Sequence, residues 1–170
     1  MTMAVVLILL FPLAMIASAG TDILSMTIPN WLTGLLAVVF FAAALAQGMA
    51  PMAVGLHAAT GLICLAITFA CFILGWMGGG DAKLIAATAL WLGPTQALAD
   101  YVVAAALFGG LLALGLLGAR ALVSPTTGVA FLDRLLIRGG GVPYGVALGA
   151  AGLMVFPDSH WGPTAFGFFA

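Results

Sequence analysis

Two aspartates mark the places where this sequence could do chemistry. Asp22 follows the first apolar run, and Asp81 closes the glycine-rich stretch GWMGGGD. A carboxylate at membrane depth is costly and is a functional candidate by default. Two carboxylates that face each other cannot both ionise cheaply, so one keeps its proton while the other can accept a proton from water. Such a pair could hydrolyse a peptide bond with neither a metal nor a covalent intermediate.

Each aspartate also has a simpler interpretation. Aspartate favours the N-terminal end of a helix, where it meets free N–H groups and the positive end of the helix dipole. Asp81 could cap the helix that it opens, and Asp22 could cap the helix that follows it. A third acid, Asp133, lies beside Arg134 and four residues before Arg138, a spacing that predicts local ion pairs.

A run of glycines surrounds the second aspartate. Gly78, Gly79 and Gly80 precede Asp81, and Lys83 follows it. Because glycine has no Cβ, the run predicts unusual φ angles and close approach of a substrate backbone. We therefore assign these glycines and Lys83 to the candidate site, although a tight turn or close helix packing would use the same residues. A phosphate-binding loop is excluded, since the spacing to Lys83 is wrong and no strand precedes the run.

The composition places the chain in a lipid bilayer. Of its 170 residues, 65% are hydrophobic and 5% are charged, and the mean hydropathy is +1.30. A soluble domain carries about 25% charged residues. The net charge of -1 gives no support for a nucleic-acid partner. We expect residues 1–170 to form one integral-membrane domain.

Six apolar segments predict an all-α protein, a polytopic bundle of about six transmembrane helices, because each crossing needs about 20 mostly apolar residues. They run approximately over Val5–Ala19, Pro29–Ala46, Ala53–Trp76, Asp81–Leu92, Ala97–Ala119 and Val142–Phe156. The first is expected to be retained rather than cleaved as a signal peptide, since no basic residue precedes it. The fourth is short, so it either continues to about Ala99 or begins below the membrane surface.

The basic residues support this count of segments. All four fall on one side of the membrane: Lys83, Arg120, Arg134 and Arg138. The positive-inside rule makes that side cytoplasmic. Both termini then lie outside, and both aspartates lie at the cytoplasmic edge of the bundle.

Three motifs resemble those of a known family, the type IV prepilin peptidases. Gly78 to Leu84, GGGDAKL, resembles the GxGD-x-K-L signature of that family. In the family a first aspartate ends the first helix shortly before Ile-Pro-Asn, and Asp22 stands in that relation to Ile28-Pro29-Asn30. The segment from Val142 to Gly149, VPYGVALG, is similar to the family's proline-containing opening of the last helix. The motifs come in the family's order and span nearly the whole chain.

The resemblance implies an intramembrane aspartyl endopeptidase of the bacterial inner membrane. Such an enzyme removes the basic leader peptide from prepilins and pseudopilins at the cytoplasmic face. Asp22 and Asp81 would be catalytic, with Pro29, Asn30 and Pro143 in structural or substrate-binding roles, and the resemblance implies neither a cofactor nor a metal. The chain lacks the cysteine-rich insert of the longer members. It is thus similar to the short form found with tight-adherence (Flp-type) pili, which does not methylate the new N-terminus.

Two other classes of function stay open. A small transporter or proton-conducting protein could use Asp22 and Asp81 as a relay. That function calls for polar residues across the membrane, and the third segment offers His57, Thr60 and Thr68. We expect His57 to lie at the membrane interface. A non-catalytic pilus-assembly subunit would not need both aspartates. The sequence indicates neither which prepilin would be the substrate nor the oligomeric state.

Overall fold

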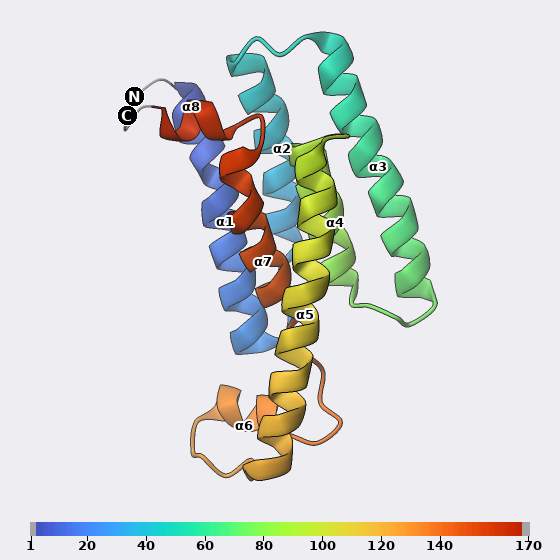
Figure 1. The fold of residues 1–170 in the computed structure, drawn as a ribbon, viewed down its shortest axis with the longest axis vertical. Helices are drawn as coiled ribbons and strands as arrows, with labels where there is room; N and C mark the ends of the chain where they lie inside the picture. The colour runs from blue at the N-terminus through green and yellow to red at the C-terminus, as the bar shows by residue number, and fades with distance from the viewer. Residues whose placement is uncertain (1–2, 168–170) are drawn as a thin grey trace.

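A computed structural model describes residues 3–167, and within that range it contains eight α-helices, a short 3-10 helix and no strand (Figure 1). The elements are α1 (Met3–Ser25), α2 (Asn30–Ala46), α3 (Pro51–Ile73), α4 (Gly79–Leu92), α5 (Gln96–Leu122), α6 (Ala130–Leu136), α7 (Tyr144–Val155), η1 (Phe156–Asp158) and α8 (Gly162–Phe166). The expected all-helical fold is confirmed.

The connections divide between the two ends of the bundle. The start of α1, the α2–α3 connection and α8 lie toward the upper end of Figure 1. The α1–α2 and α3–α4 connections and α6 lie toward the lower end. Hydrogen bonds place basic side chains at this lower end: Lys83 Nζ donates to Asn30 Oδ1 at the start of α2, and Arg134 Nη1 donates to Leu24 O near the end of α1. The basic residues and the two aspartates therefore share one end of the molecule.

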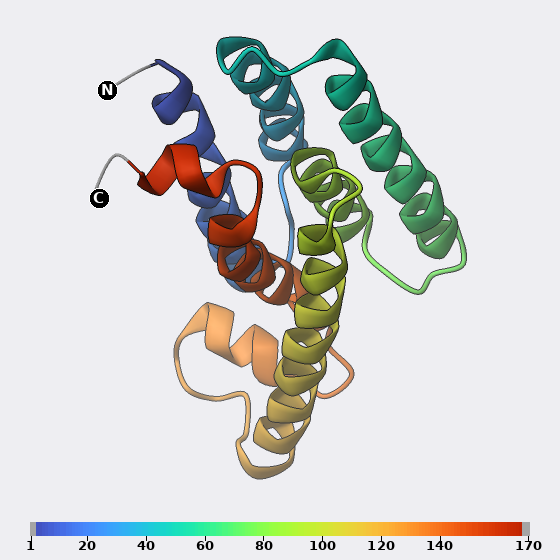
Figure 2. The ribbon, with the colours of Figure 1, turned by 45° about the horizontal axis from the view of Figure 1, so that its top comes forward.

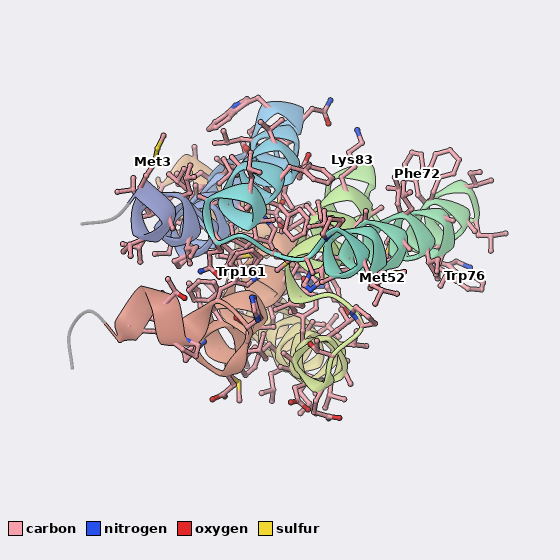
Figure 3. The ribbon with its side chains drawn as sticks, turned by 90° about the horizontal axis from the view of Figure 1, so that it is seen from above. Met3, Met52, Phe72, Trp76, Lys83 and Trp161 are labelled. Atoms are coloured by element: carbon pink, nitrogen blue, oxygen red, sulfur yellow. The ribbon has the colours of Figure 1, made fainter. Side chains whose placement is uncertain are left out.

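Aromatic side chains fill the core in the half of the bundle nearer the chain ends. The rings of Trp91 and Trp161 have centroids 5.0 Å apart, and Phe11 stacks on Phe156 at 5.0 Å. Trp161 points into the centre of the bundle (Figure 3), where its Nε1 donates to Trp91 O at 2.7 Å. The segment after α7 is thereby fastened to α4, the central helix.

The lengths of the helices only partly match the expected six crossings. Among the described residues, α1, α3 and α5 are long and apolar enough to span a membrane, whereas α2 and Tyr144–Asp158 are shorter apolar helices. The 14 residues of α4 extend about 21 Å, less than the roughly 30 Å of a hydrocarbon core. Many large apolar side chains of α3 and α5 are exposed, as contact with lipid requires. The fold is that of an all-helical membrane protein, and six complete crossings stay a prediction.

Several boundaries differ from those expected, each for a local reason. Helix α1 continues to Ser25, so Asp22 lies within the helix rather than after it. Pro29 takes the N-cap of α2 instead of its first turn. Helix α4 does not continue toward Ala99, because Gly93 follows it with a φ of +64°, which ends the helical path. Helix α5 continues to Leu122, past the expected end at Ala119, and the connection from there to α7 contains α6.

The side chain of His57 is buried rather than interfacial. It is 7% exposed, and its Nδ1 lies 2.9 Å from Leu90 O. The imidazole also stacks on Phe40, with centroids 5.4 Å apart. His57 therefore joins α3 to α4 and α2 as part of the core.

Asp133 makes different contacts from the ion pairs that its spacing predicts. Its Oδ1 accepts hydrogen bonds from the backbone N–H and from Oγ1 of Thr127, each at 2.7 Å. These hydrogen bonds hold the pKa of the exposed Asp133 carboxyl below its usual value. In the described range, it forms no hydrogen bond with Arg134 or Arg138, whose side chains donate to backbone carbonyls instead. The two hydrogen bonds between Thr127 and Asp133 therefore hold the turn before α6.

Helix α7 packs closely on α1 because small residues face the contact. A Cβ on Gly149 would lie 2.7 Å from Met15 O, and one on Gly152 would lie 2.8 Å from Met15 Sδ. Glycines at such spacings let two membrane helices approach until their backbones nearly touch. The distance between α1 and α7 therefore depends on the absence of side chains at these positions.

We expect Gly149→Ala to destabilise the fold, because the new Cβ would meet a backbone oxygen that cannot rotate away. Overpacking of this kind costs roughly 1–3 kcal/mol. Thermal unfolding in detergent, followed by circular dichroism, measures the effect. Gly115→Ala in α5 is the control, since a Cβ there meets nothing within 4 Å. An equal melting temperature for the two variants would contradict the tight α1–α7 contact.

Candidate active site

Asp22 is buried against the start of α7. The side chain is 5% exposed, and its Oδ2 accepts a hydrogen bond from the backbone N–H of Gly145 at 2.7 Å. Gly145 is the second residue of α7, where the helix has no internal partner for its N–H groups. A Cβ on Gly145 would lie 2.9 Å from Asp22 Cβ and 2.9 Å from its Oδ2. A glycine at this position therefore allows the carboxylate to reach the helix end.

Asp81 lies in the first turn of α4, one of the positions where an aspartate favours a helix. Its carboxylate turns back toward the N-cap, Gly78, so that Oδ2 is 2.9 Å from the position a Cβ on Gly78 would occupy. The side chain is only partly buried. Asp81 thus lies in the first turn of α4 rather than at the N-cap, and part of its side chain stays accessible.

Ile28 brings the starts of α4 and α7 together. It is 7% exposed and lies between two glycines. Its Cβ is 3.1 Å from the Cβ position of Gly80, and its Cδ1 is 2.9 Å from that of Gly145. Asp22 bonds to the start of α7, and Asp81 belongs to the start of α4, so both carboxylates lie beside this contact. The structure therefore brings the two expected carboxylates into one site.

Two helix N-termini point at this pair of carboxylates. Asp22 accepts an N–H from the first turn of α7, and Asp81 belongs to the first turn of α4. The N-terminal end of a helix carries a partial positive charge that favours a nearby anion. The fold thus offsets part of the cost of holding negative charge among apolar helices.

The other expected site residues position the helices. Lys83 Nζ donates to Asn30 Oδ1 at 2.8 Å, which ties the start of α2 to α4. Pro29 and Pro143 are the N-cap residues of α2 and α7. The motif residues other than the aspartates therefore hold three helix starts in place around the site.

The glycine run plays a different part from the one expected. None of Gly78, Gly79 and Gly80 has a positive φ; that conformation occurs at Gly75, with a φ of +75°. The run matters for packing instead. A Cβ on Gly79 would lie 3.3 Å from the ring of Phe72, and Gly80 lies against Ile28. Side chains of this chain itself therefore occupy the space beside Gly79 and Gly80, and approach of a substrate backbone stays a prediction.

Sequence reasoning missed two residues that shape the site. Gly145 lies in a motif, but only the packing of α7 on α1 reveals it as the donor to Asp22. Arg120 is 7% exposed, and its guanidinium donates to Leu135 O, Gly140 O and Gly141 O at 2.6–2.9 Å. It fastens the loop that leads into α7. A basic residue at the end of an apolar helix gives no signal of this role.

The arrangement suits acid–base chemistry by two carboxylates. Among residues 3–167, no group of three or more histidine, cysteine, aspartate or glutamate side chains is placed to hold a metal ion. The carboxylates themselves supply one group that can accept a proton and one that can donate it.

Comparison with protein families gives a match over most of the chain. A model of the type IV leader peptidase family matches residues 9–117. The matched region is well over half of the chain and contains both Asp22 and Asp81, while Gly145 lies beyond it. No curated protein and no solved structure matches the chain.

We expect Asp22 to be important for stability through its hydrogen bond as well as for any chemistry. Asp22→Asn keeps an oxygen that can accept the N–H of Gly145, so its melting temperature should stay near that of the wild type. Asp22→Ala leaves this buried N–H unpaired, at a cost of roughly 1–3 kcal/mol. Thermal unfolding of both variants in detergent tests the difference. Equal losses for alanine and asparagine would show that the hydrogen bond does not hold α7.

Proposed function

The chain belongs to the type IV leader peptidase family, and we propose that it is an aspartyl endopeptidase with Asp22 and Asp81 as its catalytic pair. One observation carries the proposal. Two carboxylates from helices far apart in the sequence lie at the starts of α7 and α4, which meet through Ile28. An assembly subunit without catalytic activity would have no need for this costly arrangement.

Hydrolysis would proceed by shared proton transfer. The ionised carboxylate takes a proton from a water molecule, and the hydroxide adds to the carbonyl carbon of the scissile peptide. The protonated carboxyl group donates its proton to the carbonyl oxygen. In the second step the protonated carboxyl group donates its proton to the leaving nitrogen, and the other carboxylate takes a proton from a hydroxyl group of the tetrahedral diol. The C–N bond breaks, the new carboxylic acid and amine are released, and the pair again holds one shared proton. The two aspartates titrate as a unit, so the roles of base and acid belong to the pair.

We infer that the substrates are prepilins and pseudopilins, cut after their basic leader at the cytoplasmic face of the bacterial inner membrane. The position of the basic residues supports this orientation, because Lys83 and Arg134 lie at the same end of the bundle as the aspartates. The sequence has no cysteine-rich insert. We therefore expect cleavage without methylation of the new N-terminus, as in the short form that accompanies Flp-type pili.

Neither aspartate should be replaceable by asparagine, since an amide can neither take a proton from water nor donate an acidic one. We expect Asp22→Asn and Asp81→Asn each to lower cleavage of a purified prepilin by at least about a hundredfold. The double variant should be no worse than the singles, because effects within a catalytic unit are not additive. Cleavage is measured in vesicles by the mass of the pilin N-terminus.

Asp133→Asn is the matched control for these variants. Asp133 is partly exposed and bonds only to the turn before α6, so its loss should leave cleavage unchanged. Substantial cleavage by either dyad variant, with Asp133→Asn inactive, would mean that other carboxylates do the chemistry. Uncleaved prepilin in every sample, including the wild type, would argue against this substrate class.

Gly78→Ala should lower cleavage while leaving the fold intact. The new Cβ would lie 2.9 Å from Asp81 Oδ2, the free end of a side chain that can rotate away. A displaced carboxylate should cost roughly ten- to a hundredfold in rate. Gly20→Ala, in α1 near Asp22, is the control because a Cβ there meets nothing within 4 Å. Full activity with an unchanged melting temperature would show that the resting position of Asp81 does not matter.

A further inference from the structure

An apolar groove runs along the side of the bundle where α2 and α3 stand apart. Both helices pack on α4 and hardly touch each other, so α4 forms the floor between them (Figure 2). The groove has a volume of about 630 Å³. Small residues keep it open, with Ala86 and Ala87 on the floor and Gly34, Ala37 and Gly61 on the walls. It extends from Lys83 to Leu90, or about 10 Å along the helix.

The groove has a single charged residue, and it stands at one end. Lys83 lines the groove beside Asn30, and its side chain points outward between α2 and α3 (Figure 3). The ammonium group donates to Asn30 Oδ1, which uses one of its three N–H donors. Asp81 does not line the groove, and neither does any other acid in the described range. The groove is therefore apolar along its length and positive at its mouth.

We propose that this groove binds an acyl chain of an anionic phospholipid, with the lipid phosphate held by Lys83. The charge and the shape both favour that occupant. Basic residues at the ends of membrane helices attract anionic headgroups at the membrane surface. The groove is lined by apolar side chains beyond Asn30, Thr33 and Lys83, which suits a slender acyl chain. The proposal does not rest on peptidase activity.

A bound lipid would join the same two elements as the lysine. Asn30 begins α2, and Lys83 lies in α4 two residues after Asp81. A phosphate at Lys83 would lie where these helices meet, and its acyl chain would fill the space between α2 and α3. The lipid would thus support α2 and α4 from the side opposite the core.

Native mass spectrometry of the purified protein tests the proposal directly. The protein is held in micelles doped with phosphatidylglycerol or phosphatidylcholine that carry the same acyl chains. We expect one lipid to be retained, with phosphatidylglycerol preferred about fivefold, the attraction of a single lysine for an anionic lipid. Lys83→Gln should remove the preference. Arg138→Gln, an exposed cation outside the groove, should keep it.

A second variant tests the acyl chain separately from the headgroup. Gly34→Leu adds a side chain where a Cβ meets nothing within 4 Å, so it should fill the groove and leave the fold intact. Retention of both lipids should fall in this variant, with an unchanged melting temperature. Equal retention of the two lipids by the wild type, or an unaltered preference in Lys83→Gln, would overturn the proposal. A dimer that carries no lipid and dissociates in Gly34→Leu would assign the groove to a second copy instead.

Discussion

The hydrogen bond from the Gly145 backbone to Asp22 constrains more of this structure than any other single contact. It requires α7 to approach α1 until no side chain fits between them, and glycines along α7 permit that approach. It also decides where α7 begins, because the donor must be one of the free N–H groups of its first turn. Pro143, at the N-cap, and the loop held by Arg120 both serve that position. The fold and the candidate site therefore both depend on this one hydrogen bond.

The short helix α4 faces the core of the bundle on one side and the apolar groove on another. One side carries Asp81 and Thr88 toward the other helices of the core, and Thr88 is fully buried. Another side carries Lys83 and two alanines into the groove between α2 and α3. With neighbours on most sides, α4 need not be long enough to span the lipid itself. Because α4 is short, its first turn, which carries Asp81, lies level with the end of α1, which carries Asp22.

The sequence revealed those parts of the site that depend on local signals. Asp22 and Asp81 stand out because charge is rare in this chain, and Gly93 with Pro94 marks the end of α4. The contact of Gly145 with Asp22 could not be read from spacing, since it depends on which faces of α1 and α7 meet. The role of Arg120 could not be predicted either, because its partners are backbone carbonyls, which every residue has. The lengths of the helices were harder still to predict, because apolar periodicity does not show whether other helices or lipid cover a segment.

The dependence of Asp22 on Gly145 also bears on how the protein is made. A ribosome completes α1 and α4 well before it reaches α7, so a nascent chain contains both aspartates while the donor to Asp22 does not yet exist. Until α7 is inserted, nothing holds the Asp22 carboxylate in its buried position. The site is therefore assembled in the last stage of biogenesis, and a chain whose translation stops before α7 carries both acids without their final geometry.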